Sequence, residues 1–244
     1  MEALAAVGVA FAIAGILKGA TGAGAPVVVV PVLALFYDVQ FAVAAFVVPG
    51  LVSNAWQLWQ FRRHHLSRRF SLMFAGGGVV GATTGSLMLA WLRSETLMLL
   101  VAFGVILYIG VRLLRRDLTL SQARAERIVV PVGFLAGTLQ GAAGISAPFS
   151  LTFLNAMRLA RPQFVATISG YFLSVAIVQA LMLTGLGIMT ADLYLYGALA
   201  LIPLMGLMPV GAWLVRHVSK ERFDTLILAL LFLLAVKLMA DAIA

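Results

Sequence analysis

The chain has no cysteine and few charged residues of either sign. None of its 244 residues is Cys, and only 11% are Asp, Glu, Lys or Arg. The absence of cysteine excludes disulfides, thiolate metal sites and cysteine nucleophiles. The scarcity of charge, with 63% hydrophobic residues and a mean hydropathy of +1.07, excludes both a soluble domain and a disordered chain. It predicts an all-α polytopic membrane protein.

Acidic residues are missing from the middle of the long apolar runs. The nine Asp and Glu residues all fall in loops or near the ends of apolar runs. Proton-coupled carriers usually hold a buried acid, and this sequence shows none. It also has no phosphate-binding loop, nucleotide fingerprint or catalytic-triad spacing. We therefore predict no enzyme activity, no cofactor and no metal site. Because the start lacks a basic region, no cleaved signal peptide is predicted.

Two glycine-rich segments, each ending in Ala-Pro, organise what is present. They run from Gly19 to Pro26 and from Gly141 to Pro148, 122 residues apart. Glycine loosens or breaks a helix, and proline suits the first turn of a new helix because its missing N–H needs no partner there. Each segment is predicted to join two half-helices. Broken helices at matching places in two halves point to the binding site of a transporter.

The apolar pattern predicts two homologous halves, residues 1–122 and 123–244. The first apolar run would be ~50 Å long as a single helix, well beyond a hydrocarbon core of ~30 Å, so it must break. Each half is predicted to hold one broken helix pair and three spans. In the first half these lie at 3–37, 41–61, 71–91 and 95–113, and in the second at 128–157, 164–183, 192–214 and 223–242.

The basic residues distinguish two topologies. If each broken run crosses the membrane once, the chain has eight spans, and the basic residues of segments 62–69 and 112–127 lie opposite those of the second half. If each broken run is a re-entrant hairpin, the halves are inverted repeats and 14 of the 17 Lys and Arg residues share one face. The positive-inside rule favours the hairpins. We expect cytoplasmic basic loops and both termini outside, and the net charge of +8 reflects topology rather than nucleic-acid binding.

In the inverted arrangement the two half-helices that start at the prolines face each other near the midplane. Their unpaired N–H groups and positive dipole ends suit an anion. Lys18 precedes the first break, Gln140 occupies the mirrored position, and a lysine deep in a span is a functional hypothesis by default. Two alternatives remain open: the small residues only permit close helix packing, and Lys18 snorkels to an interface.

Polar residues of the following spans complete the predicted site. Pro49 to Asn54 resembles Ser169 to Ser174 at an offset of 120, which pairs Asn54 with Ser174. Thr21 and Ser146 would add hydroxyl donors. The predicted substrate-binding residues are Lys18, Thr21, Gly22, Gly24, Ala25, Asn54, Gln140, Gly144, Ser146, Ala147 and Ser174.

Over essentially its whole length the chain resembles the TauE/SafE family of membrane permeases. The resemblance rests on the segment from Gly19 to Pro31, on its second copy from Gly141 to Pro148, and on the Ala166-Thr167 that follows. It implies transport of small sulfur-containing anions such as sulfite or organosulfonates, without fixing the substrate or the direction. One departure is that the second copy has Ile145-Ser146 where the first has Ala23-Gly24. The family is usually drawn with eight spans, whereas the charge count favours hairpins.

The leading prediction is a secondary transporter of a small sulfur-containing anion in the cell (inner) membrane, working by alternating access with its substrate between the two breaks. An anion channel and a non-transporting scaffold subunit are the alternatives, and a membrane enzyme is disfavoured. A coupling ion, H⁺ or Na⁺, is a possible partner, with unwound carbonyls near Gly22 and Gly144 as candidates for Na⁺. The oligomeric state is left open.

Overall fold

The computed structural model describes the backbone of residues 2–64, 66–114, 118–215, 217 and 220–243, and the side chains of all of these except 2–5, 220–227 and 241–243. The described part is entirely helical and contains no strand. Its ten helices are α1 (Glu2–Thr21), α2 (Ala25–Ala34), α3 (Val39–Phe61), α4 (Arg68–Trp91), α5 (Ser94–Leu114), α6 (Gln122–Ala143), α7 (Ala147–Ala156), α8 (Arg161–Gly185), α9 (Ala191–Leu214) and α10 (Lys220–Ile243).

Among the described residues, five helices are long and apolar enough to cross a membrane: α3, α4, α5, α8 and α9. The chain is therefore a multi-pass membrane protein, as its composition predicts. The ends of α3, α4, α5, α8, α9 and α10 lie within three residues of the predicted spans. Helix α6 instead begins six residues before the predicted 128. A polar turn extends the apolar run there, and the Gln122 Nε2 donates to Glu126 Oε1 at 3.2 Å.

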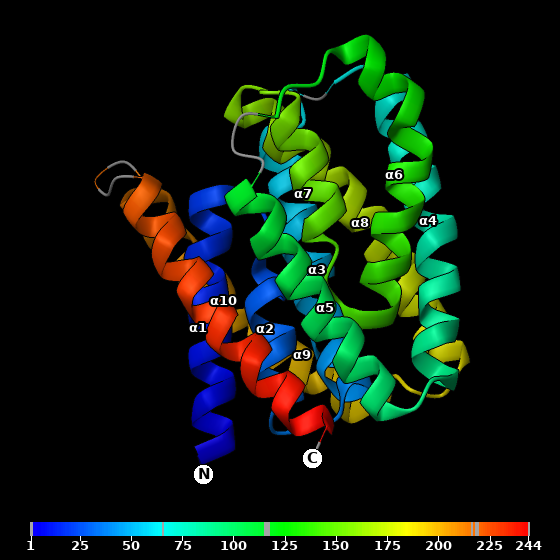
Figure 1. Cartoon of the computed structure of the whole chain (residues 1–244), viewed down its shortest axis with the longest axis vertical. Coiled ribbons are helices and arrows are strands. Elements are labelled where there is room, and N and C mark those ends of the chain that lie inside the picture. The colour runs from blue at the N-terminus through cyan, green and yellow to red at the C-terminus, as the bar shows by residue number, and fades with distance from the viewer. Residues whose placement is uncertain (1, 65, 115–117, 216, 218–219, 244) are drawn as a thin grey trace.

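Consecutive helices alternate in direction along the long axis of the molecule (Figure 1). Both termini lie at the lower end of that view, and the connections at 62–67 and 157–160 lie at the upper end. Helix α3 packs against α8, α1 against α9, α4 against α6, and α5 against α10. The lengths of the first five helices, 20, 10, 23, 24 and 21 residues, recur in order as 22, 10, 25, 24 and 24.

Glycine brings the most closely packed helices together. A Cβ on Gly81 of α4 would collide with the backbone carbonyl of Phe134 in α6, and a Cβ on Gly137 of α6 would collide with that of Gly78. Gly19 and Gly141, which open the two glycine-rich segments, meet α9 and α4 in the same way. Small residues allow such backbone approach between membrane helices. The first glycine of each glycine-rich segment, Gly19 and Gly141, therefore serves close helix packing.

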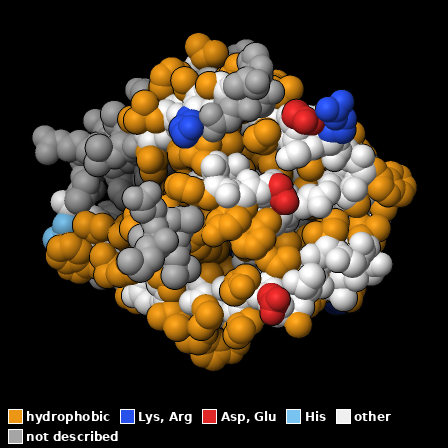
Figure 2. Space-filling view, turned by 90° about the horizontal axis from the view of Figure 1, so that it is seen from below, with side chains coloured by type: hydrophobic (Ala, Val, Ile, Leu, Met, Phe, Trp, Pro, Cys, Tyr) orange, Lys and Arg blue, Asp and Glu red, His pale blue; other side chains and the backbone are white. Residues whose placement is uncertain are grey.

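Charged residues are distributed unequally between the connections at the two ends of the molecule. Arg62 follows α3, Arg68 opens α4 and Arg158 follows α7, so all three belong to the connections at the upper end of Figure 1. The lower end, seen face-on in Figure 2, has few charged side chains among many apolar ones. Arg93 and Glu95 lie there, 3.3 Å apart as an ion pair. This separation of charge fits helices that run between two aqueous faces.

Candidate functional site

Both glycine-rich segments break the helix at equivalent points. Helix α1 ends at Thr21 and α2 begins at Ala25; helix α6 ends at Ala143 and α7 begins at Ala147. Gly22, Gly24 and Gly144 have φ angles of 84°, 86° and 67°. Side chains rarely adopt this left-handed conformation, which glycine reaches without a penalty. The later glycines of each segment are therefore required by the backbone.

The starts of α2 and α7 are buried, and no side chain caps either of them. Gly24 and Ser146 are the N-cap positions. Gly24 has no side chain, and the Ser146 side chain makes no capping hydrogen bond. By contrast, α3, α4 and α9 start at the ends of the molecule, where Asp38, Ser67 and Thr190 accept a first-turn N–H. A helix start without such a cap leaves backbone donors and the positive end of the dipole to other partners, ligands included.

The predicted hydroxyl donors serve the breaks themselves. Thr21 Oγ1 lies 2.8 Å from the carbonyl oxygen of Leu17 and 2.7 Å from that of Ala23, and it accepts the Ala23 N–H at 3.2 Å. Ser146 is 1% exposed, and its hydroxyl lies 3.1 Å from that of Ser150. Both hydroxyls are thus engaged within their own segment.

Lys18, on the last turn of α1, is buried next to the first break. Its side chain is 2% exposed, and its Nζ donates to Asn54 Oδ1 of α3 at 2.7 Å. The Asn54 Nδ2 in turn donates to the Gly50 carbonyl oxygen at 2.7 Å, which fixes the orientation of the amide. No described carboxylate lies within ion-pair distance of Lys18. Burying an ammonium without a counter-ion is costly, which favours a role in holding an anion.

Gln140, at the mirrored position of α6, is also buried but carries no charge. It is 6% exposed, and its Oε1 has no hydrogen-bond partner among the described residues. A buried polar atom left unpaired in this way calls for an explanation, and a ligand is one of those that apply.

Two glutamines secure the helix turns that carry Lys18 and Gln140. The Gln57 Nε2 of α3 donates to the Lys18 carbonyl oxygen at 3.5 Å, and the Gln179 Nε2 of α8 donates to that of Gln140 at 3.4 Å. The two glutamines are 122 residues apart, the same offset as Lys18 and Gln140. The Ser169 hydroxyl of α8 also donates to Gln57 Oε1 at 3.3 Å, which joins the two halves.

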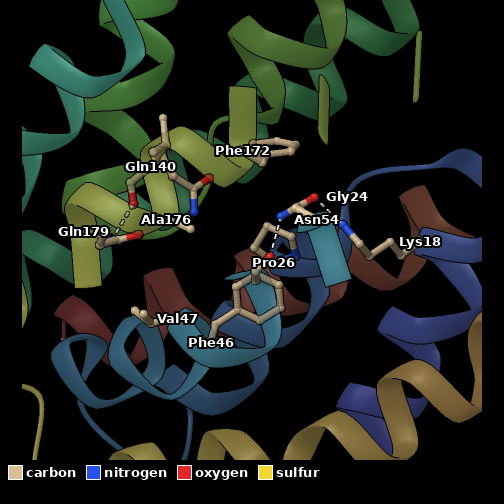
Figure 3. A pocket seen from close by; sticks show the side chains of 12 residues that line it. Lys18, Gly24, Pro26, Phe46, Val47, Asn54, Gln140, Phe172, Ala176 and Gln179 are labelled. Atoms are coloured by element: carbon tan, nitrogen blue, oxygen red, sulfur yellow. Dashed lines mark hydrogen bonds between the residues drawn. The ribbon is translucent and has the colours of Figure 1, made fainter. Parts of the chain in front are cut away.

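A narrow pocket lies between the halves and brings these groups together. Figure 3 shows Lys18 and Asn54 at one end, Gln140 and Gln179 at the other, and an aromatic ring on each wall. The space open to the centre of a water molecule is about 20 Å³, slightly more than one water requires. The lining residues are Lys18, Gly24, Pro26, Phe46, Val47, Gly50, Asn54, Gln140, Phe172, Val175, Ala176 and Gln179.

Four of the predicted site residues line this pocket, and seven do not. Those that line it are Lys18, Gly24, Asn54 and Gln140. Those outside its lining are Thr21, Gly22, Ala25, Gly144, Ser146, Ala147 and Ser174. The Ser174 hydroxyl donates to the Gly170 carbonyl oxygen of its own helix at 3.0 Å. The second half thus contributes α8 and Gln140, rather than the start of α7.

The sequence prediction left out Gln57, Gln179 and the apolar walls of the pocket. The two glutamines carry a signal in the sequence, because they obey the 122-residue offset of the glycine-rich segments. The walls, Phe46 and Val47 on α3 and Phe172 and Val175 on α8, have no distinguishing motif. Every span is rich in apolar residues, so only the packing of the helices determines which of them line the pocket.

Each break packs against the start of the long helix in the other half. A Cβ on Gly22 would collide with Val165 of α8, and one on Gly144 would lie 2.7 Å from Val30 of α2 and 3.3 Å from Val43 of α3. At the first break, and among the described residues only there, an arginine is added: the Arg161 Nη2 donates to the Gly19 carbonyl oxygen at 3.0 Å. A cation is favoured at the C-terminal end of a helix such as α1.

Among the described residues, no group of His, Cys, Asp or Glu could hold a metal ion. A family model described as "Sulfite exporter TauE/SafE" matches residues 7–238. The match covers nearly the whole chain, including both glycine-rich segments and the pocket between them. No curated protein and no solved structure matches the chain.

Proposed function

The chain belongs to the sulfite exporter TauE/SafE family, whose members are membrane transporters rather than enzymes, and on that premise we propose that it is a secondary transporter of a small sulfur-containing anion in the cell (inner) membrane. The observation that carries this proposal is Lys18, a buried cation that no described carboxylate neutralises and that faces a pocket between the halves. Sulfite and organosulfonates are the substrate classes that the family suggests.

The halves, residues 1–122 and 123–244, act as inverted repeats, each with a re-entrant hairpin and three spans. Three features support this: the recurrence of helix lengths, the alternation of helix direction, and an odd number of helices per half. The pairing of α1 with α9 mirrors that of α6 with α4. Arginines flank the connections at the end opposite the termini, and by the positive-inside rule this supports an orientation with that end in the cytoplasm.

Transport proceeds by alternating access, with the two hairpin tips as the moving contacts. The first tip meets α8 at Gly22 and Val165, and the second meets α3 at Gly144 and Val43. Parting one contact while the other stays closed opens the pocket to one side. The pocket as it stands has space for water rather than for a sulfonate, so the walls must separate for substrate to enter.

Counterflow in proteoliposomes tests this function. Purified protein should exchange sulfite or methanesulfonate with saturable kinetics and with stimulation by substrate on the opposite side. The variant Lys18→Gln should lose exchange, whereas Lys237→Gln, which removes an exposed lysine outside the pocket, should keep it. Flux that neither saturates nor responds to opposite-side substrate would instead establish a channel. Absence of both flux and anion-dependent thermal stabilisation would establish a scaffold.

A further inference from the structure

We infer that the pocket selects singly charged anions and rejects doubly charged ones, so that the substrate is a monoanion such as an alkanesulfonate or hydrogen sulfite. This inference rests on the proposed transport function and narrows its substrate class. Its basis is the charge inventory of the pocket, which has one cation at one end and an uncharged amide at the other.

Lys18 is the only charged residue among the twelve that line the pocket. At the opposite end, the Gln140 amide is uncharged, its Oε1 is itself buried and has no partner among the described residues, and Gln179 donates to the backbone of α6. Asn54 already accepts one N–H of Lys18, so two ammonium protons remain for a ligand. The site therefore offers charged donors at one end and only uncharged amides at the other.

The physics of charge burial makes this inventory selective. The cost of moving an ion out of water grows as the square of its charge, so a dianion costs about four times as much as a monoanion of the same size. Its attraction to a single ammonium is only about twice as large. One lysine can thus balance a monoanion, whereas a dianion would leave an uncompensated charge at the end of the pocket that carries no cation.

Three probes of one two-carbon skeleton test the inference by calorimetry on the purified protein. They are 2-hydroxyethanesulfonate, a monoanion; sulfoacetate, a dianion; and 2-(methylsulfonyl)ethanol, which is neutral. We expect the monoanion to bind at least about tenfold more tightly than the dianion. A difference of about 1.4 kcal/mol in binding free energy, caused by the uncompensated charge, corresponds to a factor of ten in Kd. This comparison needs no variant and so does not depend on whether a mutant folds.

Two variants then move the charge. Gln140→Lys places a second ammonium at the mirrored position and should raise the affinity for sulfoacetate relative to the monoanion by about tenfold or more. Lys18→Gln makes both ends neutral and should remove the preference of the monoanion over the neutral sulfone. Lys237→Gln, outside the pocket, should leave all three affinities unchanged.

The outcomes separate this inference from the proposed function. Equal or tighter binding of sulfoacetate by the unmodified protein would overturn the charge selection while leaving anion transport intact. A Gln140→Lys protein that folds, binds the monoanion and keeps the original ratio would overturn it as well. If no sulfur anion binds and none is exchanged in proteoliposomes, the transport function and the inference both fall.

Discussion

The two helix breaks occupy equivalent places in the fold but are built differently. Both interrupt a helix at a left-handed glycine, both precede a ten-residue helix, and both press against a valine of the opposite half. The first break has a second left-handed glycine, Gly24, where the second has Ser146. The first also has Lys18 and the Arg161 contact, whereas the second has Gln140 and no comparable arginine contact among the described residues.

This comparison shows two breaks that are alike in the backbone and unlike in charge, and under the proposed function it is the difference in charge that concerns the substrate. The left-handed glycines and the Gln57 and Gln179 contacts recur at both helix breaks, where they fix the backbone. A lysine on both sides would bury two like charges around one pocket, which is costly without two negative charges to balance them. The single Lys18 therefore marks the function more clearly than the repeated features do.

Replacing the shared glycines should have the largest effect. Gly22→Leu and Gly144→Leu each force a side chain into a left-handed residue and into a valine of the other half. We expect exchange in proteoliposomes to be abolished in both. Gly206→Leu, at a helical position where a Cβ meets nothing within 4 Å, is the matched control and should remain active. Full activity of either tip variant would show that the breaks are not moving contacts.

Replacing Lys18 should weaken anion binding more than replacing Gln140, its counterpart in the second half. Lys18→Gln should weaken binding of 2-hydroxyethanesulfonate by about 100-fold or more, because loss of one partner of a buried charge pair costs roughly 2–5 kcal/mol. Gln140→Leu removes one neutral hydrogen-bonding group, worth about 1 kcal/mol, and should weaken binding by less than about tenfold. Equal losses, measured by calorimetry, would contradict the asymmetry of charge.

Exchanging the N-cap residues of α2 and α7 should lower the stability more at the first break than at the second. Gly24→Ser puts a side chain at a φ of 86° and should lower the free energy of unfolding by about 1–2 kcal/mol. Ser146→Gly acts at a φ of −105°, which any residue adopts, and should cost less than about 1 kcal/mol. Thermal unfolding in detergent measures both. If Ser146→Gly lowered the free energy of unfolding more than Gly24→Ser does, the hydroxyl contact with Ser150 would matter more for stability than the backbone conformation.

Releasing the arginine contact should have the smallest effect and act on conformation. Arg161→Ala removes the donor to the Gly19 carbonyl, a hydrogen bond of about 1 kcal/mol at this partly exposed site. We expect a few-fold shift toward a pocket open at the upper end. Because the chain has no cysteine, a single Ala176→Cys reports this through labelling by an impermeant thiol reagent from each side. Val39→Ala, at the mirrored position, should not change labelling.

The position of the breaks could be predicted because it is a local property. Gly22, Gly144 and the two prolines act through their own backbone conformation, so their effect is the same in any context. The offset of 122 then identified Lys18 and Gln140 as counterparts, and both line the pocket. These predictions needed only the sequence and the rule that two similar segments fold alike.

The pairing of Asn54 with Ser174 shows where that reasoning stopped. It used an offset of 120. At an offset of 122, Asn54 corresponds to Ala176, and both line the pocket, while Gln57 corresponds to Gln179 through their equivalent bonds to the Lys18 and Gln140 carbonyl oxygens. Each helical residue advances about 100°, so a shift of two residues turns a side chain to roughly the opposite face. Ser174 accordingly bonds to its own helix, outside the pocket lining.

The sequence by itself determined the membrane class, the helices, the two breaks and the presence of one lysine close to the first. These follow from composition, from local backbone preference and from internal repetition. Only the tertiary structure decided that Lys18 donates to Asn54, that the buried Gln140 Oε1 has no partner among the described residues, and that Arg161 reaches across 142 positions to the first break. Such contacts depend on how helices distant in sequence are rotated and packed, and no short-range pattern encodes that rotation.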